Sequence, residues 1–309
     1  MPKNFKKEPP KPGIDARTFQ TQLATLANTL ALKVQREAIK TVKPSFVAVD
    51  IYVMLRQSLS IYQLFFFLNA DERRQKYALW TVCSAAALPL VRCMIDCLYN
   101  ITTILTNPGI KGRQFRESGY KQILDGLDAD ENRYGGDPKW DEYIASRRKF
   151  TSFDMRINNV TVVEAQTAKL WPTLSAYIRP KKNTRPTTHQ DFLRALTFGF
   201  WQEYSAMAHA TFQGLVPTAA FYTPSDIPHE ERVQFHDVSE KMISMHIFRV
   251  AAILLCTLTE IQAHFRFEGA RINERLHEVW DALIPALEVK ELYDLRYAKL
   301  MKDTHIDAK

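Results

Sequence analysis

The chain has 309 residues, of which 46% are apolar and 24% are charged, and its formal net charge is +7. This is the composition of a globular protein, and it excludes a collagen-like chain, an extensively disordered chain and a small disulfide scaffold. Its ten glycines are less than half of the usual share of about 7%. Because tight hairpins and phosphate-binding loops use glycine, the shortage favours an all-α fold.

The first residues of the chain are rich in lysine and proline. We expect a disordered basic tail over residues 1–14, followed by a single all-α domain over residues 15–309. No short apolar core with a cleavage site follows the basic start, so no signal peptide is expected.

Apolar residues then recur at spacings of three and four, which predicts long amphipathic helices. The predicted helices cover residues 15–42, 45–69 and 71–105. The longest uncharged apolar stretch is 77–91, which is shorter than the roughly 20 residues that a membrane span needs. We therefore expect no membrane-spanning helix and a cytoplasmic protein.

After a turn at Asn107-Pro108-Gly109 the chain becomes more polar, and we expect an irregular insertion over about residues 110–187. The helices predicted within it cover residues 111–131, 140–152 and 163–178. Further helices are predicted over residues 188–213, 230–265 and 272–303. The whole pattern indicates a multi-helix bundle with long central helical hairpins.

One polar stripe interrupts the apolar helix predicted over residues 71–105. Arg92, Asp96 and Asn100 are four residues apart and share one helix face. Charges among apolar neighbours need partners, because an unpaired buried charge costs several kcal/mol. The stripe is therefore either a structural ion pair or the wall of a site.

A second polar group lies on the helix predicted over residues 188–213. Trp201, Ser205 and His209 share one face, and Tyr204 lies on the adjoining face. His209 is either a general base or nucleic-acid contact, or a hydrogen-bonded core histidine.

Together the Arg92/Asp96 and Tyr204/His209 segments resemble a mainly bacterial family of all-helical domains of unknown function. That family has an Arg-x-x-x-Glu/Asp helix and a Tyr-x-x-x-x-His helix, and it implies a fold and a candidate site but no reaction. Bundles of this kind are also similar to the higher-eukaryote and prokaryote nucleotide-binding (HEPN) proteins, many of which are ribonucleases in toxin or defence systems. Their Arg-x(4–6)-His motif has one match here, Arg271 and His277, which chance alone explains.

Two basic segments could contribute to a nucleic-acid surface, or could be ordinary solvated loops. Their residues are Arg147, Arg148, Lys149, Lys181, Lys182 and Arg185. The histidines and acids lack metal-ligand spacing, and no phosphate-binding loop is present, so we expect no metal and no cofactor.

Three functions remain open on this pattern. The preferred one is a soluble binding or regulatory module with a polar site between the Arg92/Asp96 and Tyr204/His209 helices. The alternatives are a HEPN-like effector directed at nucleic acid, and a structural subunit of an assembly. Whether the chain is an enzyme stays open, and its partner could be a nucleic acid, a protein or a second copy of itself.

Overall fold

The computed structural model describes residues 19–68, 79–179, 185–209, 211–219, 228–269 and 271–303. Over these residues the backbone is helical, with connecting turns and short extended segments and without a β-strand. The predicted all-α multi-helix fold is confirmed. The predicted basic tail, residues 1–14, lies outside the described residues.

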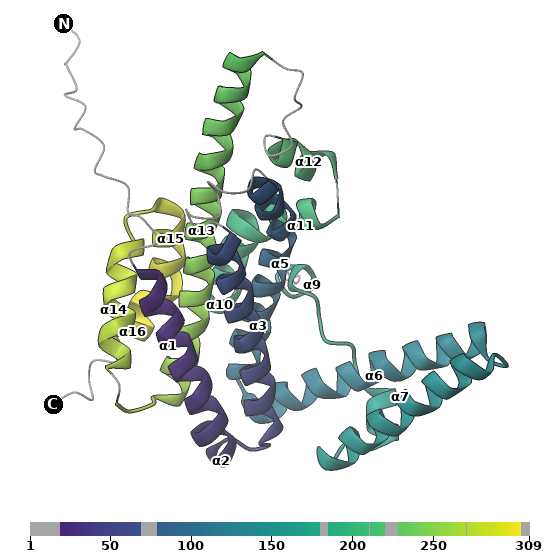
Figure 1. Cartoon of the computed structure of the whole chain (residues 1–309). Helices are drawn as coiled ribbons and strands as arrows, with labels where there is room; N and C mark the ends of the chain where they lie inside the picture. Colours follow the sequence, from purple (N-terminus) through teal and green to yellow (C-terminus); the bar gives the residue numbers. More distant parts are fainter. Residues whose placement is uncertain are drawn as a thin grey trace, which may run out of the picture.

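Three long helices lie side by side at the centre of the molecule (Figure 1). They are α3 (Phe46–Leu68), α5 (Leu79–Leu105) and α13 (His229–Phe265), and each contacts the other two. Every residue from Val250 to Leu255 of α13 is buried. A helix that is apolar on all sides belongs inside a bundle, and α13 accordingly forms the middle of the core.

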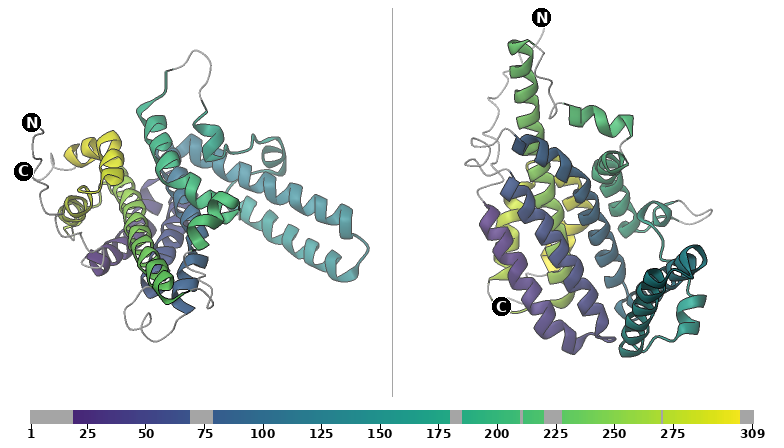
Figure 2. Two further views of the ribbon diagram at one scale, coloured as in Figure 1. Left: turned by 90° about the horizontal axis from the view of Figure 1, so that it is seen from above. Right: turned by 45° about the vertical axis from the view of Figure 1, so that its right-hand side comes forward.

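Shorter helices cover the central three on two sides (Figure 2). One group comprises α1 (Gln20–Lys33), α14 (Ile272–Leu283), α15 (Leu287–Leu292) and α16 (Ala298–Asp303). A second group comprises α10 (Thr188–Leu196), α11 (Gln202–Ala208) and α12 (Phe212–Ala219), which contact α15, α5 and α11, respectively. The helices predicted as continuous over residues 188–213 and 272–303 are therefore each divided, in part by π-helical turns at Thr197–Trp201 and Tyr293–Tyr297.

A helical hairpin projects from one end of the bundle as an arm (Figures 1 and 2). It consists of α6 (Pro108–Tyr134) and α7 (Pro138–Ile157). Each helix begins with a capping residue followed by proline: Asn107 accepts a hydrogen bond from the Ile110 amide, and Asp137 accepts one from the Lys139 amide. This is the usual sequence at a helix start.

The arm has a small core of its own, in which residues of α6 and α7 meet the short helix α8 (Val162–Thr167). The buried residues are Tyr120, Leu124, Met155, Val160 and Ala165. The region expected to be an irregular insertion therefore starts as a regular hairpin. The helix predicted over 163–178 is broken after α8, because Pro172 cannot donate a helical hydrogen bond and disfavours helix at the residue before it.

Each of the central helices is also long and apolar enough to cross a membrane. The spans are Phe46–Leu68, Cys83–Leu105 and Asp237–Phe265, with mean hydropathies of 1.3, 1.3 and 1.8. The expectation of a cytoplasmic protein without such a helix is contradicted, and these helices point toward a membrane protein. The uncharged stretch in the sequence ends at Arg92, but the helix continues, because Arg92 and Asp96 are paired one turn apart and pairing reduces the cost of both charges.

The same three spans make most of their apolar contacts with the rest of the molecule. Between 56% and 78% of each apolar window is buried inside the described structure. Length and composition therefore mark the three helices as possible membrane spans. The rest of the molecule already covers more than half of each apolar window.

Candidate functional site

Arg92 and Asp96 lie on one face of α5 and remain partly exposed. Arg92 Nε is 3.8 Å from Asp96 Oδ2, and the two side chains are 29% and 42% exposed. The spacing of four residues brings them together as expected for a helix. The third residue of the stripe, Asn100, accepts a hydrogen bond from Trp171 Nε1 at 2.9 Å.

His209 and Trp201 reach this pair from the two ends of α11. Arg92 Nη1 lies 2.7 Å from His209 Nε2, and Trp201 Nε1 donates to Asp96 Oδ1 at 3.2 Å. The Arg92 guanidinium also lies over the Trp201 ring, 5.2 Å from its centroid. The two helices therefore meet through a compact polar cluster of Arg92, Asp96, Trp201 and His209, which we call the Arg92 cluster.

The contact between Arg92 and His209 allows only one hydrogen-bond direction. A guanidinium has only donors, so Arg92 donates and Nε2 of His209 accepts. His209 ends α11 and is exposed, whereas Arg92 is partly buried.

Tyr204, the fourth residue predicted for this site, lies elsewhere. Its side chain is fully buried, and its hydroxyl forms a hydrogen bond with His246 Nδ1 of α13 at 2.8 Å. Burial raises the pKa of Tyr204 well above its usual value, which keeps the phenol neutral. Tyr204 therefore packs α11 against α13 and does not join the Arg92 cluster.

An ion pair reinforces the same contact. Arg249 Nη1 of α13 lies 2.6 Å from Glu203 Oε2 of α11, and Arg249 Nε lies 3.1 Å from Glu288 Oε1. Because this network and Tyr204 hold α11 in place, the positions of Trp201 and His209 are defined by the bundle.

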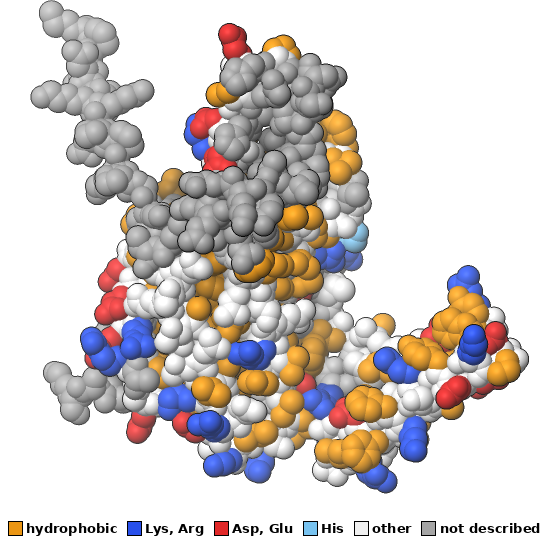
Figure 3. Space-filling model, in the orientation of Figure 1, with side chains coloured by type: hydrophobic (Ala, Val, Ile, Leu, Met, Phe, Trp, Pro, Cys, Tyr) orange, Lys and Arg blue, Asp and Glu red, His pale blue; other side chains and the backbone are white. Residues whose placement is uncertain are grey.

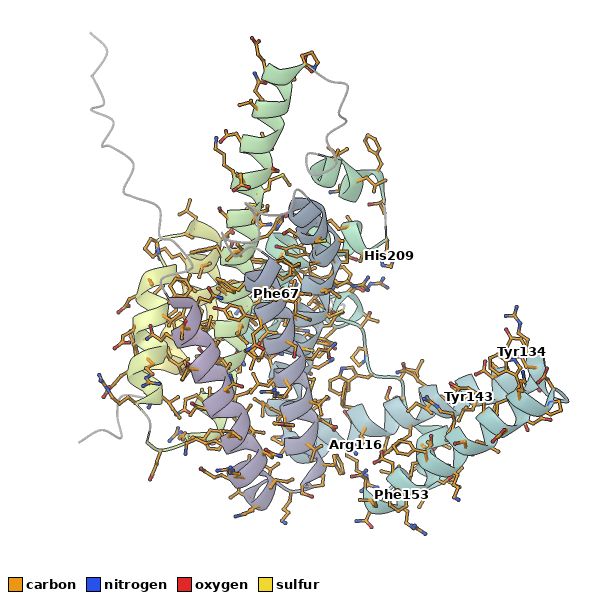
Figure 4. The ribbon with its side chains drawn as sticks, viewed as in Figure 1. Phe67, Arg116, Tyr134, Tyr143, Phe153 and His209 are labelled. Atoms are coloured by element: carbon orange, nitrogen blue, oxygen red, sulfur yellow. The ribbon has the colours of Figure 1, made fainter. Side chains whose placement is uncertain are left out.

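A groove of about 600 Å³ begins at Arg92, Asp96 and Trp201 and runs along α5 toward the arm. The aromatic side chains on its walls include Tyr99 from α5, Phe115 from α6, and Trp171 from the segment between α8 and α9 (Leu174–Tyr177), and charged side chains line both ends. Figure 4 shows the two ends on the same side of the bundle, with His209 near the Arg92 end and Arg116 where the arm joins.

The far end of the groove is closed by a second polar network. Arg116 of α6 forms two bonds with Asp50 of α3, Nη2 to Oδ1 at 2.5 Å and Nε to Oδ2 at 3.1 Å. Burial lowers the pKa of Arg116, but the hydrogen bond and charge of Asp50, together with Tyr120, outweigh this effect and leave the pKa raised. Tyr120 donates to Asp154 Oδ2 at 2.6 Å, and burial together with this bond raises the pKa of Tyr120. The carboxylates of Asp50 and Asp154 at this end thus already accept hydrogen bonds from within the protein.

The extended segment over residues 168–173 is bound to both neighbouring helices. The Trp171 amide donates to Ser118 Oγ at 2.6 Å, and Tyr99 donates its hydroxyl proton to the Pro172 carbonyl at 2.7 Å. Phe115 packs edge-on against Trp171, with centroids 5.3 Å apart. These bonds make the aromatic wall of the groove a defined surface.

The basic residues predicted for nucleic-acid contact fall on different parts of the molecule. Arg148 turns toward α6 and pairs with Asp128 and Glu131, at 2.8 Å and 2.6 Å. Arg147 and Lys149 are exposed on α7, and Arg185 is exposed just before α10 in the bundle. Lys181 and Lys182 lie outside the described residues.

The spaced pair Arg271 and His277 lies at the start of α14. Arg271 is exposed and forms an ion pair with Glu274. It immediately precedes the helix. Within the described part of the chain, no group of three or more histidines, cysteines or acids is arranged to hold a metal ion.

Two parts of the groove were not predicted from the sequence. Arg116 is 66 residues from its partner Asp50, and Trp171 is 71 residues from its partner Asn100. Both Arg116 and Trp171 lie in the segment that was expected to be an irregular insertion. The only local signal was Asp50, the one acidic residue of the largely apolar helix α3. Comparisons with protein-family models, with curated sequences and with solved structures find no match to this chain.

Proposed function

We propose that the protein is a binding or regulatory module whose ligand occupies the groove beside the Arg92 cluster. The observation that carries this proposal is that Arg92, which forms a hydrogen bond with His209, lines one end of a cavity of about 600 Å³. Sites for small ligands are concave, mostly apolar and contain a few placed polar groups. The groove has each of these features.

The two arginines of the groove, Arg92 and Arg116, differ in how far neighbouring carboxylates compensate their positive charge. Arg116 is bonded twice to Asp50, so its charge is largely compensated. Arg92 lies 3.8 Å from the carboxylate of Asp96 and gives its short hydrogen bond to the His209 ring. A guanidinium with donors to spare binds carboxylates and phosphates well. We therefore assign recognition of an acidic group to Arg92.

The aromatic walls favour a ligand that carries a planar group as well. Tyr99, Phe115 and Trp171 line the groove beyond Asp96. Rings offer large apolar faces for stacking or edge contacts. A ligand with an acidic group bound at Arg92 and a ring lying along this wall fits both halves of the groove.

Titration of the purified chain with adenosine monophosphate, benzoate and inorganic phosphate tests the proposal. We expect one of the ring-bearing acids to bind more tightly than inorganic phosphate. Arg92→Ala should weaken that binding by at least about tenfold, the cost of one charge-assisted hydrogen bond. His209→Ala should weaken it less, because His209 orients Arg92.

The matched control is Arg36→Ala, which removes an exposed arginine outside the groove and should leave binding unchanged. Thermal melts of the variants should resemble that of the wild type, because Arg92 and His209 are partly exposed or exposed. Equal affinity of wild type and Arg92→Ala for every probe, or collapse of the melt in both variants, would contradict the proposal.

Phosphodiester cleavage is the second candidate function, and the same pair favours it. A neutral histidine can accept a proton, and a neighbouring guanidinium can stabilise negative charge on a phosphate. Incubation with RNA and single-stranded DNA should then give cleavage that His209→Ala abolishes. Intact substrates with the wild-type chain would remove this candidate and leave the binding function.

A further inference from the structure

The outer face of α7 is an unusual surface that the proposed groove does not use. Its inner face packs on α6 through Ile144, Thr151 and Met155, which are buried. Its outer face exposes four large apolar side chains, and Figure 3 shows hydrophobic groups along the arm. These are Tyr143, Phe150, Phe153 and Ile157, which are 48%, 70%, 51% and 59% exposed.

The spacing of these side chains is that of a helix-packing seam. Tyr143, Phe150 and Ile157 follow one another at intervals of seven residues, and Phe153 lies between the last two. With Ser146 the series advances alternately by three and four positions, which is the pattern on which a second helix packs. Large exposed apolar patches on a folded protein usually mark such contacts.

The net charge of α7 changes sign along the helix. Lys139, Asp141 and Glu142 at its beginning give a net charge of −1, whereas Arg147, Arg148, Lys149, Asp154 and Arg156 further along give +3. Two of these arginines cover neighbouring rings, with Arg147 6.0 Å from the Tyr143 centroid and Arg156 5.5 Å from that of Phe153. A second α7 running in the opposite direction would bring the acidic beginning of one helix beside the basic end of the other.

The position of the arm leaves this face accessible. α6 and α7 extend away from the bundle in both views (Figures 1 and 2). Tyr143 and Phe153 are carried by the part of the arm that lies outside the bundle (Figure 4). Two arms could therefore meet without their bundles occupying the same space.

We propose that α7 is a self-association surface, on which a second copy of this chain packs its own α7 in the antiparallel direction. The seam supplies the apolar contact, and the change of charge along α7 makes the surface complementary to itself. A two-fold arrangement of this kind uses the same patch on both copies. This inference is independent of the ligand proposed for the groove.

Light scattering after size-exclusion chromatography tests the proposal on the full chain. We expect a dimer for the wild type and a monomer for the double variant Phe150→Glu/Phe153→Glu, with an unchanged thermal melt because both rings are exposed. The matched control is Ser152→Glu, which adds a charge to an exposed position of the same helix outside the seam and should remain dimeric.

A second set of variants tests the antiparallel direction. Glu142→Arg and Arg156→Glu should each weaken the dimer, and the combination of both should restore it, because opposite charges again face each other. A wild-type monomer would overturn the proposal, as would a dimer that survives Phe150→Glu/Phe153→Glu. Binding of a uridine oligonucleotide or of anionic phospholipid vesicles by a wild-type monomer through Phe150 would also overturn it and identify the other partner.

Discussion

At the scale of single residues, the chemistry of the candidate site depends on which neighbour each polar side chain meets. Arg92 forms a hydrogen bond with His209, and Trp201 donates one to Asp96. Tyr204, five residues before His209, faces α13 instead. Successive residues of a helix are separated by about 100°. One short helix therefore contributes some side chains to a site and others to the core.

His189 allows a prediction about pH at this scale. Burial, together with the nearby Arg296, lowers the pKa of His189 from 6.5 to about 4. Its Nδ1 is buried without a hydrogen-bond partner among the described residues. The folded protein therefore keeps His189 neutral at pH values where the unfolded chain binds a proton.

The direction of the pH dependence of stability follows from this difference in proton binding between the folded and unfolded chains. As the pH falls from about 6.5 to about 4, the unfolded chain gains a proton that the folded chain refuses, so stability decreases over this window. His189→Asn should flatten the dependence of unfolding free energy on pH there. Denaturant titrations at several pH values measure it, with Thr188→Ala keeping the wild-type slope. Parallel profiles for wild type and His189→Asn would contradict the assignment.

At the scale of helices, close packing decides where the arm leaves the bundle. Gly112 of α6 is buried against α3, and a Cβ atom at Gly112 would lie 2.3 Å from Val47 Cγ2. Val47 is itself fully buried and branched at Cβ, so it has little room to move. The glycine therefore permits the approach of the two helices.

A pair of glycine variants tests this contact. Gly112→Ala should destabilise the protein by about 1–3 kcal/mol, the usual cost of overpacking. Gly126→Ala, on the exposed side of the same helix with nothing within 4 Å of its Cβ, should stabilise it by up to about 1 kcal/mol through helix propensity. Denaturant unfolding of both variants distinguishes packing from propensity. Equal effects at the two positions would show that Val47 gives way.

At the scale of the whole molecule, three central helices have the length and hydropathy of membrane spans. Separation of membranes after expression tests this property. We expect the chain in the membrane fraction, retained after washing at high salt and released by detergent, because burial of long apolar helices in lipid is favourable. Recovery of the chain without detergent would show instead that contacts within the bundle satisfy these helices.

The sequence predicted the helical class and much of the local pairing. Low glycine content and apolar spacing indicated an all-α bundle, and the spacing of four predicted the contact between Arg92 and Asp96. The short helices α8 and α9 were predicted as one helix, which Pro172 divides. The helices α6 and α7 were predicted, but their pairing as a regular hairpin was not. Local patterns do not report how a segment is held by distant neighbours.

What the sequence determined by itself are the features that depend on residues a few positions apart: helix periodicity, caps and the polar stripe on α5. The tertiary structure alone decided which helices meet. His209 contacts Arg92, which is 117 positions away in the sequence, and Tyr204 forms a hydrogen bond with His246. The groove exists because Trp171, bonded to Ser118 and Asn100, lies over α5 and α6. Contacts of this range arise from packing between helices, which the pattern along one helix does not encode.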